Sequence, residues 1–153
     1  MGYNRRTPEE SFALNTRRDG ECLVWTGERN RDGYGRITIG GRKHLAHRHA
    51  WSRAHGAIPE GGVVDHICHN PACSEVSHLR LATRAENQAH RRGANKNSRS
   101  GLRNIRELTR GRYRVRVAKG GREHGGIFSS LPEAKAEAVR LREELFGDYA
   151  GGD

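Results

Sequence analysis

Residues 65–87, DHICHNPACSEVSHLRLATRAEN, concentrate the side chains that bind metals. This stretch holds two of the three cysteines and three of the nine histidines of the chain, with an Asp-His pair at its start and an asparagine at its end. An apolar core has little use for such side chains, because buried polar groups must all find partners. We interpret the stretch as two interleaved metal sites, one of which stabilises the conformation of the stretch.

The composition also favours a structural metal. Only 33% of the 153 residues are of hydrophobic type, and the mean hydropathy is −0.91. A small core of this kind usually needs a disulfide or a metal for stability. The odd number of cysteines argues against a pure disulfide framework, and residues 1–21 contain no signal-peptide-like apolar run. We therefore expect a reduced, cytoplasmic protein, and no run approaches the ~18 apolar residues of a membrane span.

The charge points to a polyanionic partner. The formal net charge is +10 and the pI is about 10.4, and such a field attracts nucleic acid. A membrane surface attracts cations too. The basic residues, however, are spread over strand-like and turn-rich segments rather than one amphipathic helix, so we favour nucleic acid and expect no membrane partner.

Periodicity divides the N-terminal part of the chain into short elements. We expect the first 20 residues to be polar and partly frayed. Residues 22–25 and 36–40, with glycine turns after each, predict a small antiparallel meander. Residues 44–56 have near-helical apolar spacing and predict a short helix that ends at a glycine.

The quoted stretch predicts a strand, a loop, a second strand and a helix. Residues 63–67 include three β-branched residues and run into the cysteine loop, and residues 78–82 predict the return strand. Thr83 and Glu86 have the spacing of a capping box, so we expect a helix from there to about residue 92.

The C-terminal part predicts a second domain. Residues 93–99 are small and polar, which is typical of a linker. Residues 112–117 alternate apolar side chains with arginines, which predicts a strand with one apolar and one basic face. A helical apolar stripe follows a possible capping box at Ser130 and ends at Gly147. The overall prediction is an α+β fold, in which a three-stranded antiparallel sheet packed on one helix follows a small zinc-stabilised domain.

Three candidate zinc ligands come from one loop. Cys68, Cys73 and His78 are spaced by four residues each, and tetrahedral zinc needs a fourth ligand. Cys22, on an early predicted strand, is our choice for it, and His69 is the alternative. The cysteines could instead be small buried hydrophobic residues with His78 a structural histidine. A Cys68–Cys73 disulfide is disfavoured in a reducing compartment.

The other polar residues suggest a catalytic ion. Asp65 and His66 are neighbours on a predicted strand, and Asn87 lies in the first turns of the helix that packs back across the hairpin. Carboxylate and amide oxygens are ligands for a hard cation such as Mg²⁺. His66 would stand beside the ion as a general base. On these residues alone, a turn aspartate and a structural histidine remain an open alternative.

Several motifs in residues 22–91 resemble those of a known family. The elements CLVWTG, GYGR, AHRHAW, GAIPEG, VVDHICHNPACSEVSHL and ATRAEN resemble the phage and homing-type HNH, or His-Me finger (ββα-metal), endonucleases that carry a zinc knuckle. The resemblance covers residues 22–91. His78 stands where the motif has its middle asparagine, which fits the zinc-bearing branch. Arg48 matches a basic position near the scissile phosphate, although one exposed arginine can also be simply solvated.

This resemblance implies a role for each candidate. It implies that His66 is the general base and that Asp65 and Asn87 bind the catalytic Mg²⁺ (or Mn²⁺). It also implies four ligands of a structural Zn²⁺, namely Cys22, Cys68, Cys73 and His78. Water activated by His66 would attack phosphorus while the metal neutralises charge on the phosphate and the departing 3′ oxygen. The expected place of action is the cytoplasm of a phage-infected host cell.

The basic residues cluster in the C-terminal part. Residues 93–127 hold ten Lys and Arg against two Glu, a net charge of +8. The motifs SGLRNI, YRVRV, GIF and LPEAKAEAVRLREELFGDYA resemble the DNA-binding domain of plant ethylene-response factors over residues 100–150, with Tyr113 in place of the usual tryptophan. An arginine-faced sheet can enter a major groove, although it can also be merely solvated. The candidate DNA contacts are Arg103, Arg112, Arg114 and Arg116.

We therefore predict a two-domain DNA endonuclease or nickase. Its expected parts are a nuclease domain (1–92), a linker (93–99) and a DNA-binding domain (100–150), with DNA, most simply double-stranded, as its partner. The alternative is a non-catalytic, zinc-containing DNA-binding regulator. Structured RNA or DNA substrates, and a monomer or a homodimer, all remain open.

Overall fold

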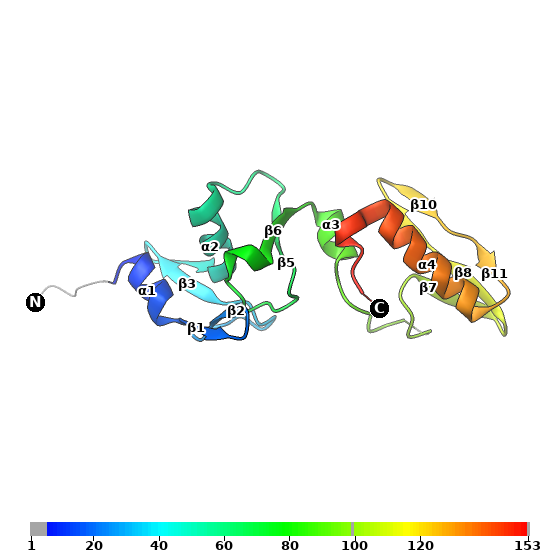
Figure 1. Cartoon of the computed structure of the whole chain (residues 1–153), viewed down its shortest axis with the longest axis horizontal. Coiled ribbons are helices and arrows are strands. Elements are labelled where there is room, and N and C mark those ends of the chain that lie inside the picture. The colour runs from blue at the N-terminus through cyan, green and yellow to red at the C-terminus, as the bar shows by residue number, and fades with distance from the viewer. Residues whose placement is uncertain (1–5, 99, 153) are drawn as a thin grey trace, which may run out of the picture. The chain divides into compact units, whose positions relative to one another are not determined.

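The computed structural model describes residues 6–98 and 100–152 (Figure 1). The chain divides into two compact units, Met1–Ala82 and Thr83–Asp153, and each is described by itself. Residues 1–5 of the predicted nuclease domain and Arg99 of the predicted linker lie outside the described residues. Residues 83–92, which we assigned to the nuclease domain, belong to the second unit.

The first unit begins with a helix that the sequence prediction missed. Helix α1 (Pro8–Leu14) is capped by Thr7 in a full capping box: the Thr7 hydroxyl accepts from the Glu10 amide, and the Thr7 amide donates to the Glu10 carboxylate. Strand β1 (Thr16–Asp19) then pairs antiparallel with β2 (Cys22–Trp25). The prediction of a frayed N-terminus is therefore wrong from residue 8 onward. The ring of Phe12 anchors the helix, with its centroid 5.8 Å from that of Trp25.

The predicted meander is replaced by two hairpins. Strand β3 (Arg36–Ile39) pairs with β4 (Arg42–Leu45) and not with β2, so the meander prediction is wrong. The reason is that both edges of β2 are used elsewhere, one by β1 and the other by the cysteine loop. Helix α2 (Ala46–His55) follows and ends at Gly56, as predicted.

The quoted stretch forms the predicted hairpin. Strand β5 (Val63–His66) pairs antiparallel with β6 (Leu79–Ala82), and a short 3₁₀ helix, η1 (Val76–His78), closes the loop between them. The two small buried clusters of this unit consist of Trp25, Ile37 and Ala46, and of Ala50, Trp51, Val64 and Leu79.

The second unit opens with α3 (Arg84–Ala89), whose capping box of Thr83 and Glu86 confirms the predicted start. The helix ends at Ala89, three residues earlier than predicted. The described residues of the predicted linker belong to this unit. The Ser98 hydroxyl donates to the Leu102 carbonyl, and the Ser98 amide donates to the Asn95 carbonyl.

The sheet and helix of the second unit confirm the predicted architecture. Strands β7 (Ile105–Thr109), β8 (Arg112–Val115) and β11 (Ile127–Phe128) form an antiparallel sheet in the order β11-β8-β7. A separate hairpin pairs β9 (Val117–Lys119) with β10 (Arg122–His124).

Helix α4 (Leu131–Phe146) completes the second unit and leads into a 3₁₀ turn, η2 (Gly147–Tyr149). Figure 1 shows α4 lying along the sheet. Its predicted apolar stripe faces the core, which consists of Ile105, Val115, Val117, Ala134, Ala138 and Leu141. Among the described residues, no helix has both the length and the apolar character needed to cross a membrane.

We predict that Gly35→Ala destabilises the first unit. A Cβ atom at Gly35 would lie 2.5 Å from the ring of buried Trp25, so ring or backbone must shift. Such overpacking costs about 1–3 kcal/mol. Gly126→Ala is the control, because its Cβ would meet only the Phe128 ring at 3.6 Å. Thermal melts followed by circular dichroism test this, and an unchanged melt for Gly35→Ala would contradict it.

Candidate metal centre and active site

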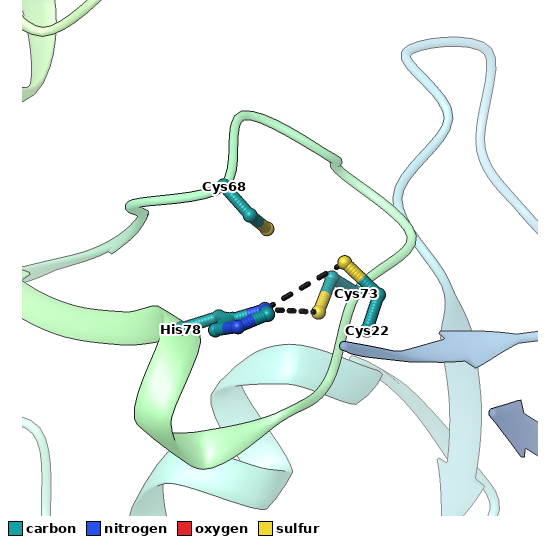
Figure 2. Close-up of side chains that lie close together, drawn as sticks. All are labelled: Cys22, Cys68, Cys73 and His78. Atoms are coloured by element: carbon teal, nitrogen blue, oxygen red, sulfur yellow. Dashed lines mark hydrogen bonds between the residues drawn. The ribbon is translucent and has the colours of Figure 1, made fainter. Parts of the chain in front are cut away.

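Four side chains from two parts of the sequence converge in the first unit (Figure 2). Cys22 begins β2, Cys68 and Cys73 lie on the loop after β5, and His78 ends η1. Their ligand atoms all lie within 4.8 Å of one another. The fourth member of the group is Cys22, which we favoured as the fourth ligand, and not His69. All three cysteines are free thiols.

Two distances within this Cys₃His group match those expected around a tetrahedral ion. His78 Nδ1 is 3.6 Å from Cys22 Sγ and 3.6 Å from Cys73 Sγ. Zinc bonds of about 2.3 Å to sulfur and about 2.1 Å to nitrogen, at a tetrahedral angle, would separate the two ligand atoms by about 3.6 Å. Thiolate and imidazole ligands in this ratio are typical of zinc.

Two backbone hydrogen bonds bring the cysteine loop to β2. The Trp25 amide donates to the Ala72 carbonyl at 2.8 Å, and the Ser74 amide donates to the Leu23 carbonyl at 2.7 Å. Cys73, between the two loop residues, forms a bridge with Val24. The loop therefore adds to the edge of β2, and this addition places Cys73 beside Cys22.

Two of the thiols would need a cation in order to ionise. Burial raises the pKa of the Cys73 thiol to about 12 and also raises the pKa of Cys68. These two thiols therefore stay protonated near neutral pH unless a cation compensates their charge. A coordinating metal would supply that compensation and displace the thiol protons. The convergence of three sulfur atoms and one imidazole nitrogen, rather than these pKa values, is what fits a metal.

His66 lies against the same loop. Its side chain is 6% exposed, and its Nε2 is 2.9 Å from the carbonyl oxygen of Cys73. A carbonyl only accepts, so Nε2 carries the proton and, in the neutral ring, Nδ1 is the acceptor. Burial lowers the pKa of His66, against the opposing effects of the Cys73 carbonyl and the Asp65 charge, which favours the neutral ring.

Asp65 has an ion-pair partner that the sequence prediction missed. Arg80 is its cross-strand neighbour on β6, and the Arg80 Nε donates to the Asp65 Oδ2 at 2.9 Å. Asp65 is 6% exposed. Strand alternation sends Asp65 and His66 to opposite faces of β5, and both faces are covered. The hairpin register was the signal that could have identified Arg80.

The remaining candidates of the nuclease motif, Asn87 and Arg48, lie on two helices. Asn87 is half-buried on α3, in the second unit, whereas Asp65 is in the first. Strands β5 and β6 and helix α3 follow one another in the predicted order. That Asp65 and Asn87 bind the same ion stays a prediction. Arg48 is half-buried on α2.

One predicted DNA contact has a structural role instead. Arg103 is 7% exposed, and its guanidinium donates to main-chain carbonyls of the second unit. The acceptors are Ala89, Arg91 at 2.8 Å, Ala150 at 3.0 Å and Gly152 at 3.1 Å. These hydrogen bonds join the end of α3 to the C-terminal segment. The prediction that Arg103 contacts DNA is therefore wrong. Arg112, Arg114 and Arg116 are exposed, as a DNA contact requires.

Comparisons with known proteins identify the family. A family model described as HNH endonuclease matches residues 44–89, which span α2, the β5–β6 hairpin and α3. Protein 3.8 of Escherichia phage T7 is 34% identical over 114 residues, which are 71% of this chain and 88% of that protein. The chain belongs to the HNH endonuclease family.

Other relatives of this HNH chain are also viral. Protein 7.7 of phage T7 is 43% identical over 67 residues, which are 44% of this chain and 52% of that protein. The uncharacterized HNH endonuclease L560 of Acanthamoeba polyphaga mimivirus is 35% identical over 96 residues, which are 62% of this chain and 49% of that protein. The chain thus spans about half the length of these two relatives. No solved structure matches it.

The comparisons do not extend to the predicted plant-type domain. The HNH family match ends at residue 89, and nothing in the comparisons supports the resemblance of residues 100–150 to plant ethylene-response factors. The three-stranded sheet with its helix is therefore a structural finding about the second unit, without a family attached.

We predict one tightly bound zinc per chain. Cys22→Ser should lose that zinc, because it removes the ligand that joins β2 to the loop. His69→Asn is the matched control, since it changes a neighbouring loop histidine outside the group and asparagine tolerates the positive φ of 57° found there. Metal analysis of the purified proteins tests this. Equal zinc contents in the two variants would contradict the assignment.

Proposed function

We propose that the chain is a metal-dependent DNA endonuclease with His66 as the general base. The observation that carries the proposal is the 2.9 Å contact of His66 Nε2 with the Cys73 carbonyl, within the segment that matches the HNH family. That contact places the ring proton on Nε2, and burial favours the neutral ring, which leaves Nδ1 as the acceptor. A general base needs such a nitrogen, held still and unprotonated near neutral pH.

The proposed reaction is the hydrolysis of one phosphodiester bond. His66 Nδ1 takes a proton from water as the water oxygen bonds to phosphorus, and the bond from phosphorus to the 3′ oxygen breaks. Asp65 and Asn87 would hold Mg²⁺ or Mn²⁺, which supplies charge neutralisation when bound. Arg80 orients the Asp65 carboxylate, and ligating carboxylates usually have such a hydrogen-bonding partner.

The proposed zinc site has a structural role in this scheme. Cys22, Cys68, Cys73 and His78 would hold Zn²⁺ in a closed site that leaves no position for substrate. Cys73 contributes its thiol to the metal and its carbonyl to His66. Zinc binding would therefore fix the orientation of the base as well as the fold of the loop.

We place the DNA-binding surface partly on the second unit. Arg112 and Arg114 alternate with core residues on β8, and Arg114 lies directly opposite Arg106 on β7. Like charges at opposed positions of a sheet repel each other, and phosphate groups would remove that repulsion. Arg116 is exposed too, in an ion pair with Glu123, and Arg48 is the proposed contact on the first unit.

A second candidate function is a DNA-binding regulator without catalysis. The Asp65–Arg80 ion pair favours it, because the carboxylate already has a cationic partner. Both candidates share the zinc site and the basic sheet, and only the endonuclease cuts DNA. The phage and mimivirus relatives support an action inside an infected host cell for either candidate.

We predict that the purified chain converts supercoiled plasmid to nicked or linear DNA in the presence of Mg²⁺ or Mn²⁺. His66→Ala should lower the rate by about 10²- to 10⁴-fold, because it removes the base, while DNA binding is retained. His44→Ala, an exposed histidine on β4, is the control and should cut normally. Gel electrophoresis measures the conversion. Cutting by His66→Ala at the rate of the unchanged chain would exclude this histidine as the base, and a wild-type chain that binds without cutting would favour the regulator.

We also predict that the double change Arg112→Ala, Arg114→Ala weakens the salt dependence of DNA binding. Each phosphate contact contributes about 0.9 to the slope of log K against log salt, so the slope should fall by about 1.8. Arg140→Ala, an exposed arginine on α4 that pairs with Glu137 and Glu144, should leave the slope unchanged. Fluorescence anisotropy on a short duplex tests this. Equal slopes for all three proteins would remove the sheet from the interface.

A further inference from the structure

Two aromatic rings pack against the ring of His66. The ring centroid of His47 is 4.5 Å from that of His66, at an interplanar angle of 55°. The ring of Tyr34 lies 5.3 Å from His47 and 5.8 Å from His66. Such tilted contacts are favourable for aromatic rings at this range. The imidazole of His66 is therefore held by two neighbouring rings in addition to its hydrogen bond.

The backbone fixes where His47 and Tyr34 meet. The Ala46 amide, at the start of α2, donates to the Gly35 carbonyl at 2.9 Å. This bond joins the residue before His47 to the residue after Tyr34. The two rings therefore come to His66 from a helix and a loop that are tied to each other.

The His47 ring is buried beside that of His66. Its side chain is 4% exposed, and its Nδ1 has no hydrogen-bond partner among the described residues. Burial, with the nearby charges of His66 and Arg48, lowers the pKa of His47 to about 3, so its ring is neutral and does not repel His66.

A single hydrogen bond does not by itself fix a histidine ring. The bond to the Cys73 carbonyl defines the position of Nε2, and the ring can still turn about that contact. Packing against the neighbouring rings restricts this freedom. Catalysis by a general base depends on such orientation, since a misplacement of about 1 Å can cost about 10²-fold in rate.

We propose that His47 is a positioning residue for His66: its ring, packed at 4.5 Å, keeps Nε2 on the Cys73 carbonyl and Nδ1 directed to the reacting water. The proposal rests on the endonuclease function proposed above. His47 itself exchanges no proton with the substrate. Its contribution lies in the shape of its ring rather than in its unpartnered nitrogen.

Two variants of the full zinc-loaded chain separate the ring from the nitrogen. His47→Phe retains a ring and lacks the nitrogen, and His47→Asn retains a short polar group and lacks the ring. We expect kcat to fall by about 10- to 100-fold in His47→Asn and by less than about 3-fold in His47→Phe. KM should stay within about 2-fold in both, because neither change removes a DNA contact.

A second readout does not depend on cutting. The ¹⁵N chemical shifts of the His66 ring at pH 8, without DNA or Mg²⁺, should report one tautomer with the proton on Nε2 in the wild type and in His47→Phe. In His47→Asn they should move toward the average of both tautomers. His49→Ala is the matched control, because this half-buried histidine of α2 packs on Phe12 instead, and it should change neither readout.

The outcomes distinguish the positioning role of His47 from the endonuclease function on which it rests. A His47→Asn protein with full zinc content, wild-type kcat and unchanged His66 shifts would overturn the positioning role, and so would a His47→Phe protein as impaired as His47→Asn. A wild type that cuts no DNA would overturn the endonuclease function alone, because the ring shifts still decide the packing role. Zinc content and melting temperature of each variant show that it is folded.

Discussion

The addition of the cysteine loop to the edge of β2 is the constraint on which the candidate site depends. Two backbone hydrogen bonds, from Trp25 to Ala72 and from Ser74 to Leu23, hold Cys73 in place. Its thiol then reaches the metal group, and its carbonyl reaches His66. One residue thus connects the element that stabilises the fold to the group proposed to carry out the chemistry.

This dependence follows from the small size of each core. The buried clusters of the first unit contain only a few large side chains, and Trp25 and Trp51 are the largest of them. Such cores give little stability to a long loop between two strands. A metal bound by both the loop and β2 would supply the missing restraint. The second unit has a separate core and holds its C-terminal segment with the buried guanidinium of Arg103.

Local patterns were enough to predict the elements whose signals lie in their own residues. The hairpin of β5 and β6, the capping box at Thr83 and the stripe of α4 are of this kind. The Cys₃His group was also predictable, because zinc limits both the type and the number of its ligands. Helix α1 carried the same kind of signal, in the spacing of Thr7 and Glu10, and was overlooked in a polar segment.

Other features depend on contacts that no local pattern contains. Nothing near Arg103 in the sequence distinguishes it from the exposed arginines, since its acceptors lie at the end of α3 and in the C-terminal segment. The pairing of Arg80 with Asp65 requires the strand register. The packing of His47 on His66 requires the placement of α2 against β5, which follows from tertiary structure alone.

The most direct test of the link between the metal and the base is the state of the His66 ring with zinc bound and after its removal by a chelator. In ¹⁵N NMR at pH 8, we expect one tautomer with the proton on Nε2 in the zinc-bound protein, and averaged tautomers once the cysteine loop has lost its metal. His66 ring signals that stay the same after complete removal of zinc would contradict the claim that the Cys₃His group orients this histidine.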